Sequence, residues 1–294
     1  MEQVTSVSSR LLTTKLVIGK WTGEAAVPKI ARDAEKSNSA KSGTVKATAR
    51  AFESPELTAV LQEMNSLYIW WRDVTSPWRD GGWRVLLGET AMEFLDEARE
   101  RIGRIERDLV PAFLASYPQR LEEMKLGMGA LYLQVRYPTP EDMRNRFTIR
   151  MSMEAVPDAD MLKRFGEVFS ANEIEAAREA ERMQVQAAME DVWTKLATPV
   201  EHLIDVLTRA DMGQHKRWHD SIVTNIADAA RTAAKLNFTG SKELVEVADA
   251  MLADLAVAKT GTLRDAPEVR ADVKAKAEAI KARMAGFLPK PVEG

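Results

Sequence analysis

The stretch SANEIEAAREAERMQVQAAMEDVWTKLATPVEHLIDVLTRA, residues 170–210, decides the fold class of this chain. Ser170 is followed three residues later by Glu173, which is the pattern of a capping box at a helix start. A helix over about 171–210 would be roughly 60 Å long at ~1.5 Å per residue, longer than a compact domain is wide. Pro199 falls inside this stretch and predicts a kink or a break. We therefore expect a fold built around long helices.

Helical spacing of apolar residues continues over most of the remaining chain. The last predicted helices carry long charged faces and narrow apolar stripes, which is typical of antiparallel hairpins and bundles. Such helices often bury the rest of their apolar surface against another copy or a partner. Tyr117-Pro118 and Tyr137-Pro138 are expected helix stops. Helices are predicted over about 55–71, 89–115, 119–134, 216–235, 241–257 and 267–285.

Two segments have the pattern of strands. Residues 11–22 are β-branched and partly alternating, and residues 146–154 alternate apolar and polar side chains in the manner of a half-buried strand. An isolated strand would leave its backbone groups without partners, so the two segments are expected to pair. The predicted fold class is mainly α, with long antiparallel helical hairpins or a bundle and a small antiparallel β-sheet.

Charge and composition suggest three regions. Residues 1–53 hold the first strand and a basic mobile arm, because residues 31–50 are small, polar and basic. Residues 54–160 form a helical hairpin with a tryptophan-rich loop and a strand, and residues 161–294 form a long-helix region. The first fifty residues carry nine lysines and arginines against four acids, while the whole chain has a net charge of −3. Such an arm can contact phosphates or can simply be a soluble, flexible segment.

Several classes of protein are disfavoured by what the sequence lacks. There is no cysteine, so disulfides, thiolate zinc sites and cysteine nucleophiles are excluded. No apolar run approaches the ~20 residues of a membrane span, and the first residues do not resemble a signal peptide. No phosphate-binding loop, nucleophile elbow or zinc-protease motif occurs. We expect a cytoplasmic protein that is not an enzyme and binds no cofactor and no membrane.

One group of residues has metal-ligand spacing. Asp211, His215 and His219 recur every four residues and would share one face of a helix. Gly213 interrupts that helix, and polar residues near a helix start are the simpler interpretation. A metal-dependent hydrolase centred on these residues is the least favoured alternative.

The stretch IWWRDVTSPWRDGGW, residues 69–83, holds four of the seven tryptophans. On a helical wheel Trp71 falls within the apolar stripe and is predicted to be core, whereas Trp70 falls outside it and is either exposed or covered by another element. Gly81-Gly82 predicts a tight turn. Three interpretations of the stretch are open: core residues that fix the loop, a protein interface, or a platform on which single-stranded bases stack.

This same stretch carries a resemblance to a known family. Residues 75–87, TSPWRDGGWRVLL, resemble the T-x-PW-x-D-x-G-x-R-x-LL segment of a family of phage and prophage proteins of unknown function. Shorter matches include residues 19–23, 236–240 and 284–287. The resemblance implies a phage-encoded intracellular protein that accompanies MoxR-type AAA ATPases and von Willebrand A-type proteins. It implies no catalytic residues.

These observations favour a self-assembling, non-enzymatic scaffold or adaptor for a macromolecular partner, in the setting of phage DNA transactions. The expected partners are further copies of the chain and an AAA ATPase. The main alternative is a protein that binds or anneals single-stranded nucleic acid through the basic arm and the tryptophan-rich stretch. Residues predicted to contact a partner or nucleic acid are Lys36, Lys41, Lys46, Arg50, Trp70, Arg72, Trp78, Arg79, Trp83 and Arg84.

Overall fold

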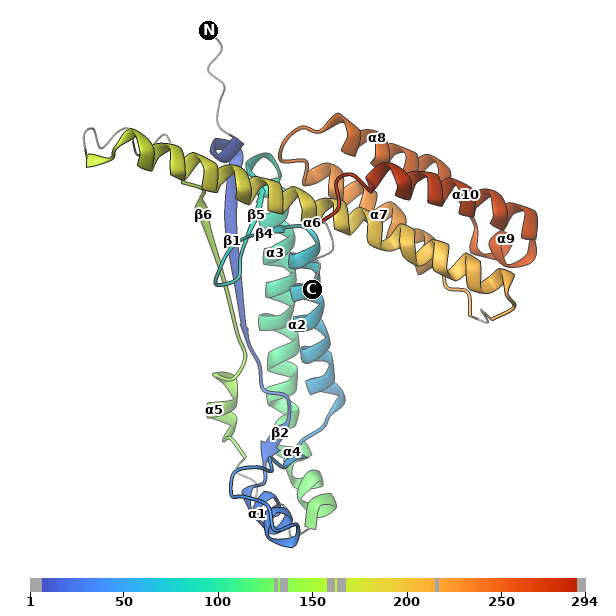
Figure 1. The fold of residues 1–294 in the computed structure, drawn as a ribbon. Coiled ribbons are helices and arrows are strands. Elements are labelled where there is room, and N and C mark those ends of the chain that lie inside the picture. Colours follow the sequence, from blue (N-terminus) through green and yellow to red (C-terminus); the bar gives the residue numbers. More distant parts are fainter. Residues whose placement is uncertain are drawn as a thin grey trace. The chain divides into compact units, whose positions relative to one another are not determined.

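The computed structural model describes residues 7–129, 132, 137–157, 162, 168–214 and 217–289 (Figure 1). The chain is 67% helical and has a small four-stranded antiparallel sheet, which confirms the predicted mainly α class. It divides into two compact units. Unit 1 contains Met1–Lys15, Trp71–Met92 and Ser152–Gly294, and unit 2 contains Leu16–Trp70 and Glu93–Met151.

The four-stranded sheet contains both predicted strands. Its order is β4 (Ser76–Arg79), β5 (Trp83–Leu87), β1 (Leu11–Gly19) and β6 (Thr148–Ala155). The predicted pairing of residues 11–22 with residues 146–154 is confirmed, because β1 and β6 are neighbours. Exposed and half-buried side chains alternate along β6, as the sequence pattern predicted.

The other two strands form a hairpin in the tryptophan-rich stretch. β4 and β5 are antiparallel, with Arg79 opposite Trp83. The φ angles of Gly81 and Gly82 are 79° and 80°, a conformation that favours glycine, and these residues reverse the chain between Arg79 and Trp83. The predicted turn is confirmed. The strands themselves were not predicted, because four or five residues are too few for alternation to be read from sequence.

The long helix of unit 1 is α6 (Ala171–Asp211), drawn in yellow in Figure 1. Ser170 accepts from the backbone N–H of Glu173 while the Glu173 carboxylate accepts from Ser170, so the predicted capping box is confirmed. Of the kink or break predicted at Pro199, the break is wrong, since α6 is one helix of 41 residues, and the kink stays a prediction. Buried neighbours such as Leu196, Val200 and Leu203 outweigh the loss of one backbone donor at the proline.

Two of the remaining helices of unit 1, α7 and α10, contact α6, and α8 and α9 pack on these two helices. Trp193 of α6 is buried and stacks on Phe287, with ring centroids 4.4 Å apart. The face of the sheet formed by Leu11, Val85 and Leu87 belongs to the same core. These helices are α7 (Ser221–Lys235), α8 (Lys242–Ala250), a π-helical turn (Met251–Leu255), α9 (Thr260–Asp265) and α10 (Pro267–Met284).

Unit 2 contains the segment for which a mobile arm was predicted. The prediction of a loop over residues 31–50 is wrong in part, because α1 covers Pro28–Ser37 and β3 (Thr48–Arg50) pairs with β2 (Glu24–Ala26). The carboxylate of Glu35 is buried and accepts from the backbone N–H groups of Gly43 and Val45 at 2.8 and 3.0 Å. This acceptor ties the intervening loop to α1, a long-range effect that composition does not reveal.

Four further α-helices and an aromatic core complete the described part of unit 2. The predicted stop at Tyr117-Pro118 is wrong, because α4 continues through Pro118. Tyr117 is fully buried against Trp21, Phe52 and Phe113, and its hydroxyl donates to the carbonyl of Pro138 at 2.9 Å. The predicted helix over 119–134 is the second half of α4, with residues 130, 131 and 133–134 outside the described part. The helices are α2 (Pro55–Asp73), α3 (Ala91–Arg104), a π-helical turn (Ile105–Leu109), α4 (Val110–Met128) and α5 (Pro140–Arg144).

Within the residues that the structure describes, none of the helices has both the length and the apolar character needed to cross a bilayer.

Candidate functional site

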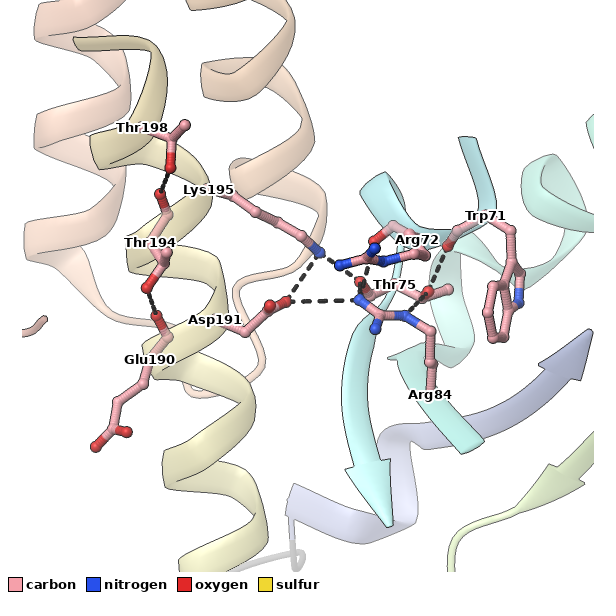
Figure 2. Close-up of polar contacts among 9 residues, drawn as sticks. All are labelled: Trp71, Arg72, Thr75, Arg84, Glu190, Asp191, Thr194, Lys195 and Thr198. Atoms are coloured by element: carbon pink, nitrogen blue, oxygen red, sulfur yellow. Dashed lines mark hydrogen bonds and ion pairs between the residues drawn. The ribbon is translucent and has the colours of Figure 1, made fainter. Parts of the chain in front are cut away.

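A connected polar group of unit 1 is centred on Arg84 of β5 (Figure 2). Its guanidinium donates to the hydroxyl and the carbonyl of Thr75 at 2.8 and 2.6 Å, and to the carbonyl of Arg72 at 2.9 Å. It also lies over the ring of Trp71, 5.6 Å from the centroid. Because Arg84 is only 8% exposed, it joins the end of α2 to the β4–β5 hairpin from inside the fold.

A second cation reaches the same group from α6. Figure 2 shows Lys195 and Asp191 pointing from α6 toward Arg84 and Thr75. The Lys195 ammonium lies 2.9 Å from the Asp191 carboxylate and donates to the Thr75 carbonyl. Asp191 also faces Arg84, 3.7 Å away. Asp191 therefore lies between two cations and links α6 to the hairpin.

Burial shifts two titratable groups here. It lowers the pKa of the Lys195 ammonium, because the charged form loses water, while Asp191 opposes that shift. It raises the pKa of the Asp73 carboxyl, against the neighbouring charges of Lys195, Arg72 and Arg84. Both shifts favour the neutral forms of these groups.

A cavity of about 690 Å³ opens beside this group. Arg84 and Ile222 are its buried members, and Arg72, His202 and Asp228 are exposed. The hydroxyls of Thr194 and Thr198 donate to carbonyls of their own helix and add no free donor. The cavity is lined by Arg72, Asp73, Arg84, Asp191, Thr194, Lys195, Thr198, Pro199, His202, Ile222, Asn225, Asp228, Ala229 and Thr232.

The tryptophans of the tryptophan-rich stretch differ in how far they are buried. Trp71 and Trp78 are buried, which confirms the prediction that Trp71 is core. Trp70 is half-buried and stacks on Phe94, with centroids 5.2 Å apart, while Arg101 lies over its ring. Trp70 was predicted to be either exposed or covered by another element. The structure shows that it is covered.

A small aromatic and basic cluster remains accessible on the hairpin. Trp83 is half-buried, with the Arg79 guanidinium 4.4 Å and the Lys15 ammonium 5.9 Å from its ring centroid. Arg79 is exposed and forms an ion pair with Glu154 at 2.9 Å. We call Lys15, Arg79 and Trp83 the hairpin cluster.

The predicted basic residues of the arm do not share a compact unit with this cluster. Lys36, Lys41, Lys46 and Arg50 are exposed and belong to unit 2, whereas the hairpin cluster belongs to unit 1. The ten predicted contact residues are thus divided between two units and between core and surface.

The predicted metal ligands are only partly described. Asp211 forms an ion pair with Arg270 at 3.0 Å, and His215 lies outside the described residues. Across the described ranges, which include His219, no group of three or more potential metal ligands comes together. The full set of three residues stays a prediction.

Sequence reasoning missed Thr75, Asp191 and Lys195. A signal for the last two exists, because they form an i,i+4 charge pair beside the buried positions Val192 and Leu196 of α6. Charges placed so close to an apolar stripe indicate a buried or half-buried partner.

The first third of α6 has a different character from the rest. Residues 171–184 contribute no buried side chain, and the buried stripe begins at Val185. Ion pairs between Arg182 and the carboxylates of Glu175 and Glu179, at 3.0 and 2.6 Å, run along its surface. Four exposed apolar residues follow one line at spacings of four, three and four: Ala176, Ala180, Met183 and Ala187.

We call these four residues the α6 seam. Their spacing is that of the a and d positions of a coiled coil. Met183 at its centre is 63% exposed, which is unusual for a side chain that favours apolar contacts.

Comparison of the chain with protein-family models gave no match, and no curated protein and no solved structure matches it significantly.

Proposed function

We propose that this chain is a non-enzymatic scaffold or adaptor protein that self-associates through the α6 seam. The observation that carries the proposal is the exposed apolar line along residues 176–187 of a helix whose C-terminal part is firmly held in the core of unit 1. A long helix anchored at one end presents such a line in a fixed direction, as a scaffold requires.

The contacts that the buried charges make also support a structural role. Arg84, Asp191 and Lys195 connect α2, the hairpin and α6 through contacts of 2.6–3.7 Å. These contacts therefore hold α6 against the end of α2 and the hairpin. A rigid support under an exposed helix face is what an interaction surface needs.

The partner and the setting follow from the sequence resemblance. We propose a phage-encoded protein of the host cytoplasm that works beside a MoxR-type AAA ATPase in phage DNA transactions. The support for this is the match of residues 75–87 to the family segment, in which Arg84 is one of the matching positions.

Native mass spectrometry of the full chain tests self-association. The chain has a mass of 32.8 kDa, and the proposal predicts a species at a whole-number multiple of it. Met183→Glu should shift the population to the single chain, because two charges would face each other in the paired seam. Met212→Glu is the matched control, since Met212 is also 63% exposed at the end of α6 but lies outside the seam. A single-chain mass for the unaltered protein at micromolar concentration would reject the proposal.

A second candidate function rests on the hairpin cluster. A half-buried indole with two cations near its ring is suited to stacking a base of single-stranded nucleic acid next to a phosphate. Adding a single-stranded oligonucleotide to the same native measurement tests it. Binding that weakens steeply with salt and is lost in Trp83→Ala supports this function. Retention of binding in Trp83→Ala would remove the cluster from consideration.

A further inference from the structure

We infer that the cavity beside Arg84 is a binding site for a small organic acid, with the carboxylate next to Lys195 and the apolar part against Pro199, Ile222 and Ala229. Nothing in the proposed scaffold role requires this site. The inference rests on the charges of the cavity, the apolar residues in its lining and its size.

The charged wall has a surplus of positive charge. Three cations, Arg72, Arg84 and Lys195, face two carboxylates, Asp73 and Asp191. The third carboxylate of the lining, Asp228, is balanced by Arg231 at 3.4 Å. One negative charge would therefore complete the balance of the wall.

Lys195 is the group that can contact this anion directly. Its ammonium carries three N–H donors, and its contacts use two of them, on Asp191 and on the Thr75 carbonyl. The third donor can be given to a ligand. Because Lys195 is largely removed from water, an ion pair made there is stronger than one on the surface.

Part of the lining is apolar. Pro199 of α6 and Ile222 and Ala229 of α7 line the cavity beside polar residues such as Asn225 and Thr232, and Ile222 is buried. A bare anion such as phosphate would leave the three apolar side chains in contact with water, whereas the apolar part of an organic acid would cover them. The cavity volume of about 690 Å³ lies within the range of small-molecule sites, ~300–1,000 Å³. The combination favours an organic acid over an inorganic anion.

Ligand-observed NMR titration of the full chain with benzoate tests the inference, and benzamide serves as the neutral probe of the same shape. Benzoate should bind saturably, with the millimolar affinity normal for so small a probe. Benzamide should bind about tenfold more weakly. Inorganic phosphate should compete poorly. Equal binding of benzoate and benzamide, or equal competition by phosphate, would overturn the inference.

Two variants of α7 locate the site without altering its charges. Ala229→Phe fills the cavity and should abolish benzoate binding. Ala234→Phe places the same side chain at an exposed position of the same helix and should leave binding unchanged. Lys195→Gln should weaken binding about tenfold, with circular dichroism confirming that the variant is folded. Unchanged benzoate affinity in Ala229→Phe would show that benzoate binds elsewhere and that the inference is wrong.

Discussion

Replacing Arg84 by methionine should destabilise unit 1 far more than replacing any exposed arginine of the same hairpin. Methionine replaces the apolar stem of the side chain and removes the guanidinium. The three hydrogen bonds to Thr75 and Arg72, at 2.6–2.9 Å, and the ion pair with Asp191 are then lost.

The magnitude follows from the partners that remain. Lys195 still binds the Thr75 carbonyl and the Asp191 carboxylate. The carbonyl of Arg72 and the hydroxyl of Thr75 lose their hydrogen bond to Arg84 without a replacement. A hydrogen bond to a charged group contributes about 1.5–3 kcal/mol. Two such bonds are lost without a replacement, so we expect the free energy of unfolding to fall by about 3–6 kcal/mol.

Arg79→Met is the matched control. Arg79 lies in the same hairpin, but its ion pair with Glu154 joins side chains that are 40% and 52% exposed. Surface pairs of this kind contribute about 0–1 kcal/mol. The expected loss is therefore about 1 kcal/mol or less.

Peptide-resolved hydrogen exchange over a urea series is the suitable assay, because a chain with two compact units need not unfold in one step. Peptides from residues 185–207 report the stability of unit 1. If Arg84→Met costs no more than Arg79→Met in these peptides, the reasoning that Arg84 joins α2, the hairpin and α6 is refuted.

Three further predictions concern unit 2. Glu35→Ala should raise the hydrogen-exchange rates of the Gly43 and Val45 amides, measured by NMR, because both lose their acceptor. Unchanged rates would contradict the claim that Glu35 holds this loop against α1. Gly23→Ala should destabilise unit 2 by about 1–3 kcal/mol in urea unfolding, since φ is 78° and the new Cβ would lie 2.2 Å from a backbone oxygen; a neutral effect would count against this geometry. Burial raises the pKa of Tyr117 to about 12, so the stability it contributes should be complete below about pH 10 and lost as pH rises toward 12; an alkaline unfolding profile identical in Tyr117→Phe would disprove this.

Long, strongly periodic elements could be predicted from the sequence. The capping box at Ser170 and the start at Pro55 mark α6 and α2 correctly, and alternation finds β6. These signals are local, since each depends on residues within one or two turns. The expected break at Pro199 and stop at Pro118 are wrong because packing around each proline overrides a local preference.

The candidate site could be predicted only in part. Arg84 belonged to the expected contact residues, but as a surface group; the structure buries it among backbone carbonyls of Thr75 and Arg72. Its partner Asp191 and the neighbouring Lys195 are more than a hundred residues away along the chain. A single sequence carries no signal for such a distant contact beyond the charged pair itself.

The most direct test of the central claim uses the fact that the chain has no cysteine of its own. A single Ala180→Cys substitution places one thiol in the α6 seam, and Met212→Cys places one outside it. Under mild oxidation at low micromolar concentration, the account predicts that Ala180→Cys forms a covalent dimer rapidly and Met212→Cys does so only slowly. Equal rates for the two variants would contradict self-association through the seam.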